Sequence, residues 1–191
     1  MNIEKEKRID QILLLLKKCD YLTREQLQRM VNLGKTRNAQ RILKDLSNYI
    51  SNFTENKKKV YYLNSNGRER VQSEKIRKKT AMVTHYLMRN DLYITVGRPI
   101  SWRNEVEISI NSVSLIADAA YISNKLHHFV EIDNKQSMSN NIQKIKKYKK
   151  LSTYNPQFVL IWVTTTPYRK KKLESLSQGL KFKIYLWEDL K

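Results

Sequence analysis

Residues 115–151 have the sequence LIADAAYISNKLHHFVEIDNKQSMSNNIQKIKKYKKL. Alternating and apolar runs predict strands over Leu115–Ile122 and His128–Asp133, separated by a short turn. Ser137 is a helix-capping residue type and is predicted to begin an amphipathic helix. Two paired strands followed by a helix therefore decide the fold of this part of the chain.

Further elements are predicted on both sides of this stretch. A helix from about Arg77 to Asp91 and a strand over Glu105–Ile110 precede it. An apolar strand over Phe158–Val163, a basic helix over Tyr168–Gln178 and a final strand over Phe182–Leu186 follow it. The predicted order is αβββαβαβ, which is that of a mixed α/β domain.

The first 72 residues predict a different arrangement. Apolar residues from Ile9 to Leu16 recur at the spacing of an amphipathic helix, and Thr23 with Gln26 forms a capping-box sequence that begins a second helix. A third helix extends to about Ile50, and a basic hairpin follows it. Three helices followed by a basic hairpin are the order of a winged helix-turn-helix, which we predict for residues 1–72.

The polar face of the third predicted helix carries long hydrogen-bonding side chains at helical spacing. In the major groove, arginine pairs with guanine and glutamine with adenine edges. Lysines at the tip of the hairpin are placed to contact phosphates, which position a protein on DNA without reading its sequence. The alternatives are a merely solvated helix face and a winged helix that binds protein or RNA. The residues that we expect to contact DNA are Arg37, Gln40, Arg41, Lys44, Lys57, Lys58, Lys59 and Lys147.

The charge of the chain indicates a polyanionic partner. Its 191 residues include 37 Lys+Arg and 18 Asp+Glu, a net charge of +19, of which +11 lies in residues 1–80 and +8 in residues 81–191. Nucleic acids and lipid surfaces are both polyanions, but no apolar run approaches the length of a membrane span. The sequence has no signal-peptide pattern and a single cysteine. We therefore expect a cytoplasmic protein that binds DNA rather than a membrane.

Three carboxylates are predicted to meet in the second half of the chain. Asp118 lies on one predicted strand, and Glu131 and Asp133 share a face of the next because they are two residues apart. Close carboxylates repel unless a cation neutralises them, and hard oxygen ligands suit Mg²⁺ or Mn²⁺. Asp118 and Glu131 are thus the expected metal ligands of a catalytic site. The alternative is that these acids are solvent-facing residues of edge strands.

This section of the sequence resembles the replication-relaxation family, whose members join a winged helix to a PD-(D/E)XK nuclease-like fold. The family pattern falls on Ala117-Asp118-Ala119, on Glu131-Ile132-Asp133, and on Lys144 with Tyr148. The resemblance implies a role in the replication, relaxation or transfer of a plasmid or mobile element. It also implies double-stranded DNA and other replication or mobilisation proteins as partners.

The fold class implied by the resemblance is α+β. It places a winged helix-turn-helix at residues 1–72, a helical junction at residues 73–80, and at residues 81–191 an α/β domain with the αβββαβ core of restriction endonucleases.

The sequence departs from the family pattern at the position of the catalytic lysine, which holds Asp133. In an active nuclease of this fold, that lysine stabilises charge on the phosphate. Lys135 or Lys144 is the candidate to replace it, so the catalytic set would be Asp118, Glu131, Asp133, Lys135 and Lys144.

Three hypotheses for the function follow from these residues. The first is a sequence-directed DNA-binding protein whose nuclease-like domain serves DNA binding and needs no cofactor. The second is an endonuclease that depends on Mg²⁺ or Mn²⁺. The third is a transcriptional regulator whose second domain forms a homodimer.

Overall fold

The computed structural model describes residues 3–191, which contain seven α-helices and two β-sheets. The chain divides into two compact units, Met1–Asn90 and Asp91–Lys191, and each unit combines helices with one sheet. The protein is therefore of the mixed α+β class that the sequence predicts. None of the helices within residues 3–191 is long and apolar enough to cross a membrane.

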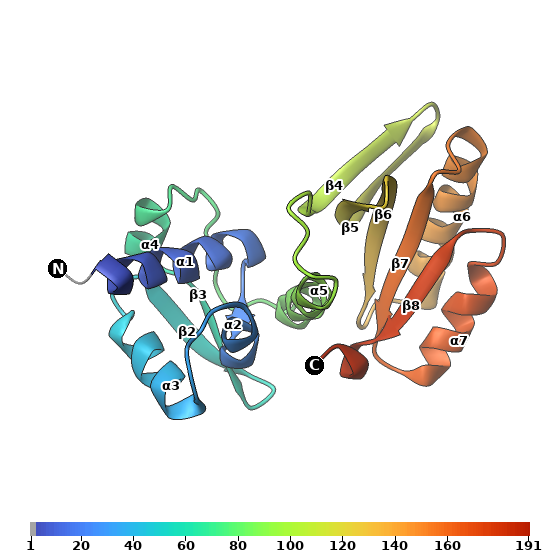
Figure 1. Ribbon diagram of the computed structural model, residues 1–191. Helices are drawn as coiled ribbons and strands as arrows, with labels where there is room; N and C mark the ends of the chain where they lie inside the picture. Colours follow the sequence, from blue (N-terminus) through green and yellow to red (C-terminus); the bar gives the residue numbers. More distant parts are fainter. Residues whose placement is uncertain (1–2) are drawn as a thin grey trace. The chain divides into compact units, whose positions relative to one another are not determined.

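The first unit packs four helices against a small antiparallel sheet with the strand order β1-β3-β2 (Figure 1). Its helices are α1 (Ile3–Cys19), α2 (Arg24–Met30), α3 (Thr36–Asp45) and α4 (Ser65–Arg70). Its strands are β1 (Leu22–Thr23), β2 (Ile50–Glu55) and β3 (Lys58–Leu63). Apolar residues from each helix-forming pattern, including Leu13, Leu27 and Leu43, are buried in its core.

Local capping explains where two of these helices begin. The side chain of Thr23 accepts a hydrogen bond from the backbone N–H of Gln26, whose side chain accepts one from the Thr23 N–H, so the predicted capping box is present. Asn64 caps α4 by accepting from the Gly67 N–H at 3.0 Å. Residues 64–67, which their composition predicts as a turn, thus form the start of a helix. Gly67 fits there because a Cβ would lie 2.0 Å from the carbonyl oxygen of Tyr49.

Helix α5 (Val83–Thr95) begins six residues later than the helix predicted from Arg77. The two residues that directly follow α1 hold the segment before α5 outside a helix. Arg77 donates two hydrogen bonds to Asp20, and the Tyr21 hydroxyl donates to the Lys78 carbonyl. The first compact unit ends at Asn90, so it includes residues 73–90. The boundary between the two units therefore falls within α5.

The second unit is a five-stranded mixed sheet with the order β4-β5-β6-β7-β8. Its strands are β4 (Arg103–Ile110), β5 (Val113–Ser123), β6 (Leu126–Asp133), β7 (Phe158–Thr164) and β8 (Phe182–Leu186). Its connecting helices are α6 (Met138–Tyr154) and α7 (Pro167–Leu176), and a short 3₁₀ helix follows at Trp187–Leu190. The first three strands pair antiparallel and the last three parallel. The order of these elements is the one that the sequence predicts.

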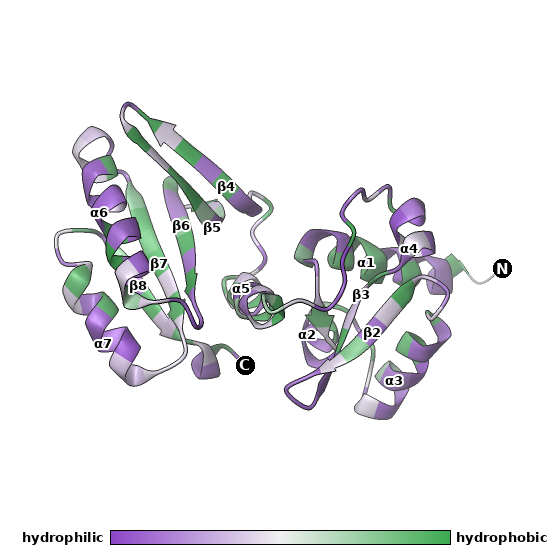
Figure 2. Ribbon diagram, turned by 180° about the vertical axis from the view of Figure 1, so that it is seen from behind, coloured by the Kyte–Doolittle hydropathy of each residue, from purple (hydrophilic) through white to green (hydrophobic). Residues whose placement is uncertain are grey.

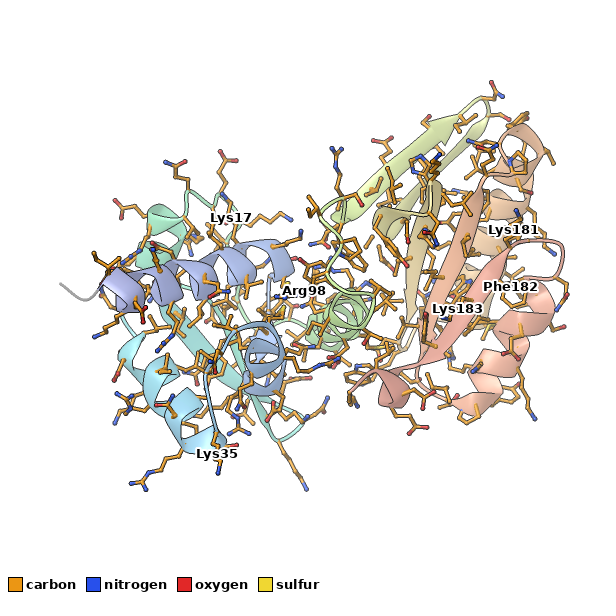
Figure 3. The ribbon with its side chains drawn as sticks, in the orientation of Figure 1. Lys17, Lys35, Arg98, Lys181, Phe182 and Lys183 are labelled. Atoms are coloured by element: carbon orange, nitrogen blue, oxygen red, sulfur yellow. The ribbon has the colours of Figure 1, made fainter. Side chains whose placement is uncertain are left out.

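Helices α6 and α7 cover the same face of this sheet (Figure 1). Ile145 and Tyr148 of α6 and Leu173 of α7 share one core with the inward residues of the strands, such as Trp162. Figure 2 shows the matching pattern, with hydrophobic residues along β7 and hydrophilic residues on the outer sides of both helices. The edge strand β8 carries the exposed Lys183, and the exposed Lys181 directly precedes it (Figure 3), a charge pattern that discourages edge-to-edge pairing.

Candidate functional site

The exposed face of α3 carries four polar side chains that the sequence predicts to contact DNA. Ala39 and Leu43 are buried in the first unit and fix the orientation of the helix. The opposite face presents exposed side chains, namely Arg37, Gln40, Arg41 and Lys44. The structure thus brings these four residues together on one surface, as their 3.6-residue spacing predicts.

The hairpin formed by β2 and β3 brings the three predicted lysines to the same side of this unit. Its turn is tight because Asn56 and Lys57 adopt left-handed backbone angles, with φ of 47° and 63°. Lys57, Lys58 and Lys59 are all exposed.

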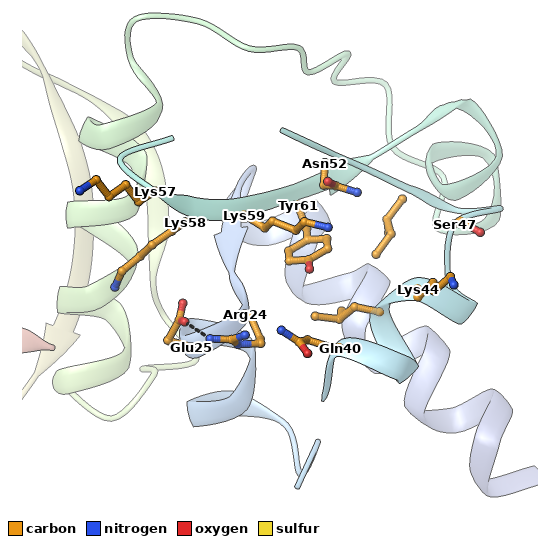
Figure 4. A pocket seen from close by; sticks show the side chains of 12 residues that line it. Arg24, Glu25, Gln40, Lys44, Ser47, Asn52, Lys57, Lys58, Lys59 and Tyr61 are labelled. Carbon is orange, nitrogen blue, oxygen red and sulfur yellow. Dashed lines mark hydrogen bonds and ion pairs between the residues drawn. The ribbon is translucent and has the colours of Figure 1, made fainter. Parts of the chain in front are cut away.

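An open groove of about 540 Å³ lies between α3 and the hairpin (Figure 4). Cations from α2, α3 and the hairpin line it, whereas Glu25 is the one acid in its lining and is paired with Arg24 at 2.6 Å. The lining residues are Arg24, Glu25, Gln40, Leu43, Lys44, Ser47, Ile50, Asn52, Lys57, Lys58, Lys59 and Tyr61. Sequence reasoning missed Arg24, Asn52 and Tyr61, because only the packing of α2 and the sheet against α3 brings them into this groove.

A separate acidic site lies in the second unit, where β5 changes the face that it buries. Alternate residues over Val113–Ala117 belong to the core formed with Ile145 of α6. Four residues further on, Tyr121 instead stacks on Trp102, with ring centroids 5.5 Å apart. The period of two that governs a regular strand is therefore interrupted at Asp118.

Both neighbouring ladders are also interrupted at Asp118. The pairing of β5 with β4 skips Asp118 and Glu105, whose φ is 54°, and the pairing with β6 ends at Ala119 and Val130. The Ile132 N–H, which β5 no longer pairs beyond this point, donates instead to Asp118 Oδ2 at 2.7 Å. Beyond the break, the β4–β5 hairpin leans away from β6 (Figure 1). Asp118 thus lies at the point where the sheet splits.

Glu131 of β6 lies beside Asp118 and is completely buried, with 0% of its surface exposed. The Tyr148 hydroxyl donates to Glu131 Oε1 at 2.8 Å, and the Lys144 ammonium donates to Glu131 Oε2. Burial and the charge of Asp118 raise the pKa of Glu131 to about 8, although Lys144 and Tyr148 act in the opposite direction. Glu131 is therefore a carboxyl group whose protonation state depends on its immediate partners.

Lys144 is the cation that the structure places in this site. Its ammonium also donates to the Ile116 carbonyl at 3.3 Å. Partial burial would lower the pKa of Lys144, but the charges of Glu131 and Asp118 outweigh it and the pKa lies above its ordinary value. Of the two lysines that the sequence proposes as replacements for the missing motif lysine, Lys144 lies at the carboxylates, whereas Lys135 is exposed in the loop between β6 and α6.

Asp133, the third predicted carboxylate, belongs to a different network. It is buried, and its oxygens accept hydrogen bonds from Thr164 Oγ1 at 2.6 Å, Asn141 Nδ2 at 2.8 Å and Arg169 Nε at 2.7 Å. A second nitrogen of Arg169 also donates to it. These partners, which lie on α6, β7 and α7, occupy both oxygens of Asp133 and fix the end of β6.

The site offers two carboxylates to a metal ion. Within residues 3–191, no three His, Cys, Asp or Glu side chains are close enough together to form a metal-binding group. Mg²⁺ in phosphoryl-transfer sites is nevertheless held by one or two carboxylates, together with water and substrate phosphates. Asp118 and Glu131 fit that donor set in residue type. Lys147, one turn after Lys144, donates to the Ser114 carbonyl at 2.9 Å, on the part of β5 that does not pair with β6.

Comparison with known proteins supports one family. The family model described as Replication-relaxation matches residues 13–158, which is more than half of the chain. No curated protein matches significantly.

Two solved structures are similar to the chain at low identity. Protein VC1899 from Vibrio cholerae has 16% identity and a TM-score of 0.42, covering 99% of this chain and 49% of that one. Can2 from Sulfobacillus thermosulfidooxidans, in complex with cyclic tetra-adenylate, has 14% identity and a TM-score of 0.37, covering 96% of this chain and 48% of that one. The chain spans about half the length of each.

Proposed function

Because the chain belongs to the replication-relaxation family, we propose that it is a sequence-directed, double-stranded DNA-binding protein of a plasmid or mobile element. It acts there in replication, relaxation or transfer. The first unit is a winged helix-turn-helix in which α3 reads the major groove and the β2–β3 hairpin is the wing. The second unit is a nuclease-like domain with a PD-(D/E)XK type of core.

The basic groove between α3 and the hairpin is the observation that carries this proposal. Exposed arginine and glutamine side chains on α3 match the edges of guanine and adenine, and lysines on the hairpin match phosphates. The groove collects five cations around a single paired acid. A solvated surface has no need to concentrate like charges, whereas a phosphate backbone neutralises them.

Substitution of Arg41 tests the reading face. The Arg41 guanidinium is exposed and donates to Asn38 Oδ1 at 3.0 Å, which holds it on the α3 surface. We expect Arg41→Ala to weaken duplex binding by about 1–3 kcal/mol in a gel-shift assay if Arg41 contacts a base edge. Lys7→Ala, an exposed cation on α1, is the matched control. Equal affinities of Arg41→Ala and the control would show that α3 does not read DNA.

A metal-dependent endonuclease is the second candidate function, and the position of Lys144 favours it. The family position of the catalytic lysine holds Asp133, but Lys144 brings an ammonium to Glu131 from the helix instead. Asp118 and Glu131 would hold Mg²⁺ or Mn²⁺, which would supply Lewis-acid activation of the phosphate. Lys144 would stabilise charge on the same phosphate, and Tyr148 would fix the orientation of Glu131.

A plasmid-nicking assay separates the two candidates. We expect the endonuclease to relax supercoiled plasmid with Mg²⁺ or Mn²⁺ and to lose this activity on Asp118→Ala. Asp189→Ala, an exposed acid of the 3₁₀ helix, controls for the change in charge. Intact plasmid with both metals would assign the second unit to DNA binding alone.

A further inference from the structure

We propose that the outer surface of α6 and α7 is a second DNA-binding surface, which holds a duplex by its phosphate backbone without reading sequence. This inference rests on the proposed function, since it assigns a second contact to the same partner. It differs from the α3 groove in its residues, its unit and its expected dependence on sequence.

The stretch that contains these helices is strongly basic, with Glu174 of α7 as its single acid. Residues 134–173 include ten Lys or Arg and no Asp or Glu. The whole second unit, by comparison, has 16 basic and nine acidic residues. The positive charge is therefore concentrated in this part of the chain, and Glu174 is the only acid within the two helices.

The fold directs much of this charge outward. Ile145, Tyr148 and Leu151 anchor α6 in the core, which leaves Lys146, Lys149 and Lys150 exposed on the opposite side. This outer face is distinct from the one that carries Lys144 and Lys147, whose ammonium groups bond to carbonyls of β5.

Helix α7 continues the same surface. Leu173 packs in the core shared with α6, and Lys171 and Lys172 are exposed. The Lys172 ammonium lies 5.7 Å from the centre of the exposed Tyr168 ring. The outer sides of both helices are hydrophilic in Figure 2, and the two helices lie on one face of the sheet in Figure 1.

The neighbouring lysines on the outer side of α6 repel one another and so lower the stability of the isolated helix. Lys146 lies three and four residues before Lys149 and Lys150, and like charges at these spacings destabilise a helix by a few tenths of a kcal/mol per pair. A polyanion along the helix removes that repulsion and releases its own counterions. With 17 residues, α6 is about 25 Å long, which matches about seven base pairs of duplex.

A duplex fits the surface better than a membrane does. Binding in a lipid interface requires an apolar face that inserts between the headgroups. The outward side of α6 instead offers the exposed polar residues Lys146, Lys149, Lys150 and Thr153. The exposed large aromatic side chains of the two helices are Tyr154 and Tyr168, which carry polar hydroxyls and do not form an apolar face. The partner that the surface recognises is thus a regular array of phosphates.

The test compares two triple variants of the full chain that lose the same charge. The first is Lys146→Ala, Lys149→Ala and Lys150→Ala on α6, and the control is Lys5→Ala, Lys7→Ala and Arg8→Ala on the exposed side of α1. Alanine favours a helix and removes the like-charge contacts, so the α6 variant is expected to melt no lower than the parent. Affinity for a random-sequence duplex is measured by fluorescence anisotropy over a range of NaCl concentrations.

We expect the α6 variant to lower the slope of log K against log salt by up to about 2.7, since each lost phosphate contact contributes about 0.9. The control should change that slope less. Equal slopes and affinities for the two variants would overturn the proposal. The proposal would also be overturned if the parent bound phosphatidylserine vesicles and the α6 variant lost this binding but still bound duplex like the parent.

The outcome is separable from that of the α3 experiment. If Arg41→Ala leaves binding unchanged while the α6 variant loses it, the reading face is wrong and the backbone surface stands. If Arg41→Ala weakens binding and the α6 variant matches its control, the first unit binds DNA and the second surface does not.

Discussion

Glu131 is the residue whose chemistry depends most on the fold. Its carboxyl is buried beside Asp118, and its two oxygens receive the Tyr148 hydroxyl and the Lys144 ammonium. The pKa of about 8 means that the folded protein holds a proton that the unfolded chain releases near pH 4.5. Between these two values the native state binds more protons than the unfolded state, so stability falls as the pH rises.

Glu131→Gln tests this linkage. Glutamine keeps the shape of the side chain but does not ionise, so the variant should lack the fall in stability between about pH 5 and pH 8. A difference of one pKa unit corresponds to about 1.4 kcal/mol, so the melting temperature of the variant should rise relative to the parent by several degrees over this interval. Glu188→Gln, at an exposed position, should run parallel to the parent. A pH-independent offset between Glu131→Gln and the parent would contradict the raised pKa.

At the scale of the elements, the buried carboxylate of Asp20 is one anchor of the segment between α4 and α5. Asp20 Oδ1 accepts from Arg77 at 2.6 and 2.9 Å, and Asp20 Oδ2 accepts from Arg89 at 2.8 Å. Arg89 is 1% exposed, so its guanidinium has little access to water. Asp20 therefore connects the end of α1 to both the irregular segment and the first part of α5.

Asp20→Asn should destabilise the first unit by about 3–5 kcal/mol, because it leaves the buried Arg89 without its counter-charge. Asp20 has a φ of 68°, and asparagine tolerates this left-handed backbone, so the variant changes the charge without straining the turn. The control is Glu55→Gln, since Glu55 pairs with the exposed Lys79 at 3.6 Å and should cost less than about 1 kcal/mol. Urea unfolding measures both. Equal losses would show that Asp20 is not the anchor.

The sequence predicts those features that depend on neighbours along the chain. The spacing within α3 predicts which side chains are exposed, and the capping box at Thr23 predicts where α2 begins. The start of α5 is predicted too early because Arg77 is held by Asp20, which is 57 residues away. In the second unit as well, the features that depend on contacts between residues far apart in the sequence are not predicted.

The acidic site shows which of its features can be predicted from local sequence and which cannot. A shared face for Glu131 and Asp133 follows from the period of a strand, and both side chains do contact α6. Their separate roles do not follow from it, because Arg169, 36 residues further along the chain, engages Asp133 alone. The break of β5 at Asp118 likewise depends on two neighbouring strands rather than on local sequence.

At the scale of the whole molecule, both units carry excess positive charge. The first has 21 basic and nine acidic residues, and the second has 16 and nine. Charge of one sign destabilises a compact state by self-repulsion, which salt screens. The same charge strengthens binding to DNA, which salt weakens by reducing the gain from counterion release. Salt should therefore have opposite effects on the free and the bound protein.

We expect that raising NaCl from about 20 mM to about 300 mM raises the melting temperature of the free protein, because the Debye length shortens to less than the spacing of many surface charges. With duplex DNA in excess, the melting temperature at low salt should exceed that of the free protein, since a ligand of the native state stabilises it. The same rise in NaCl should then lower it. Uncharged dextran at equal mass is the control and should leave both curves unchanged.

A fall in the free protein's melting temperature with salt would show that attractive ion pairs, such as those at Asp20, outweigh the net repulsion. An identical salt response with and without duplex would show that the excess charge does not serve DNA binding.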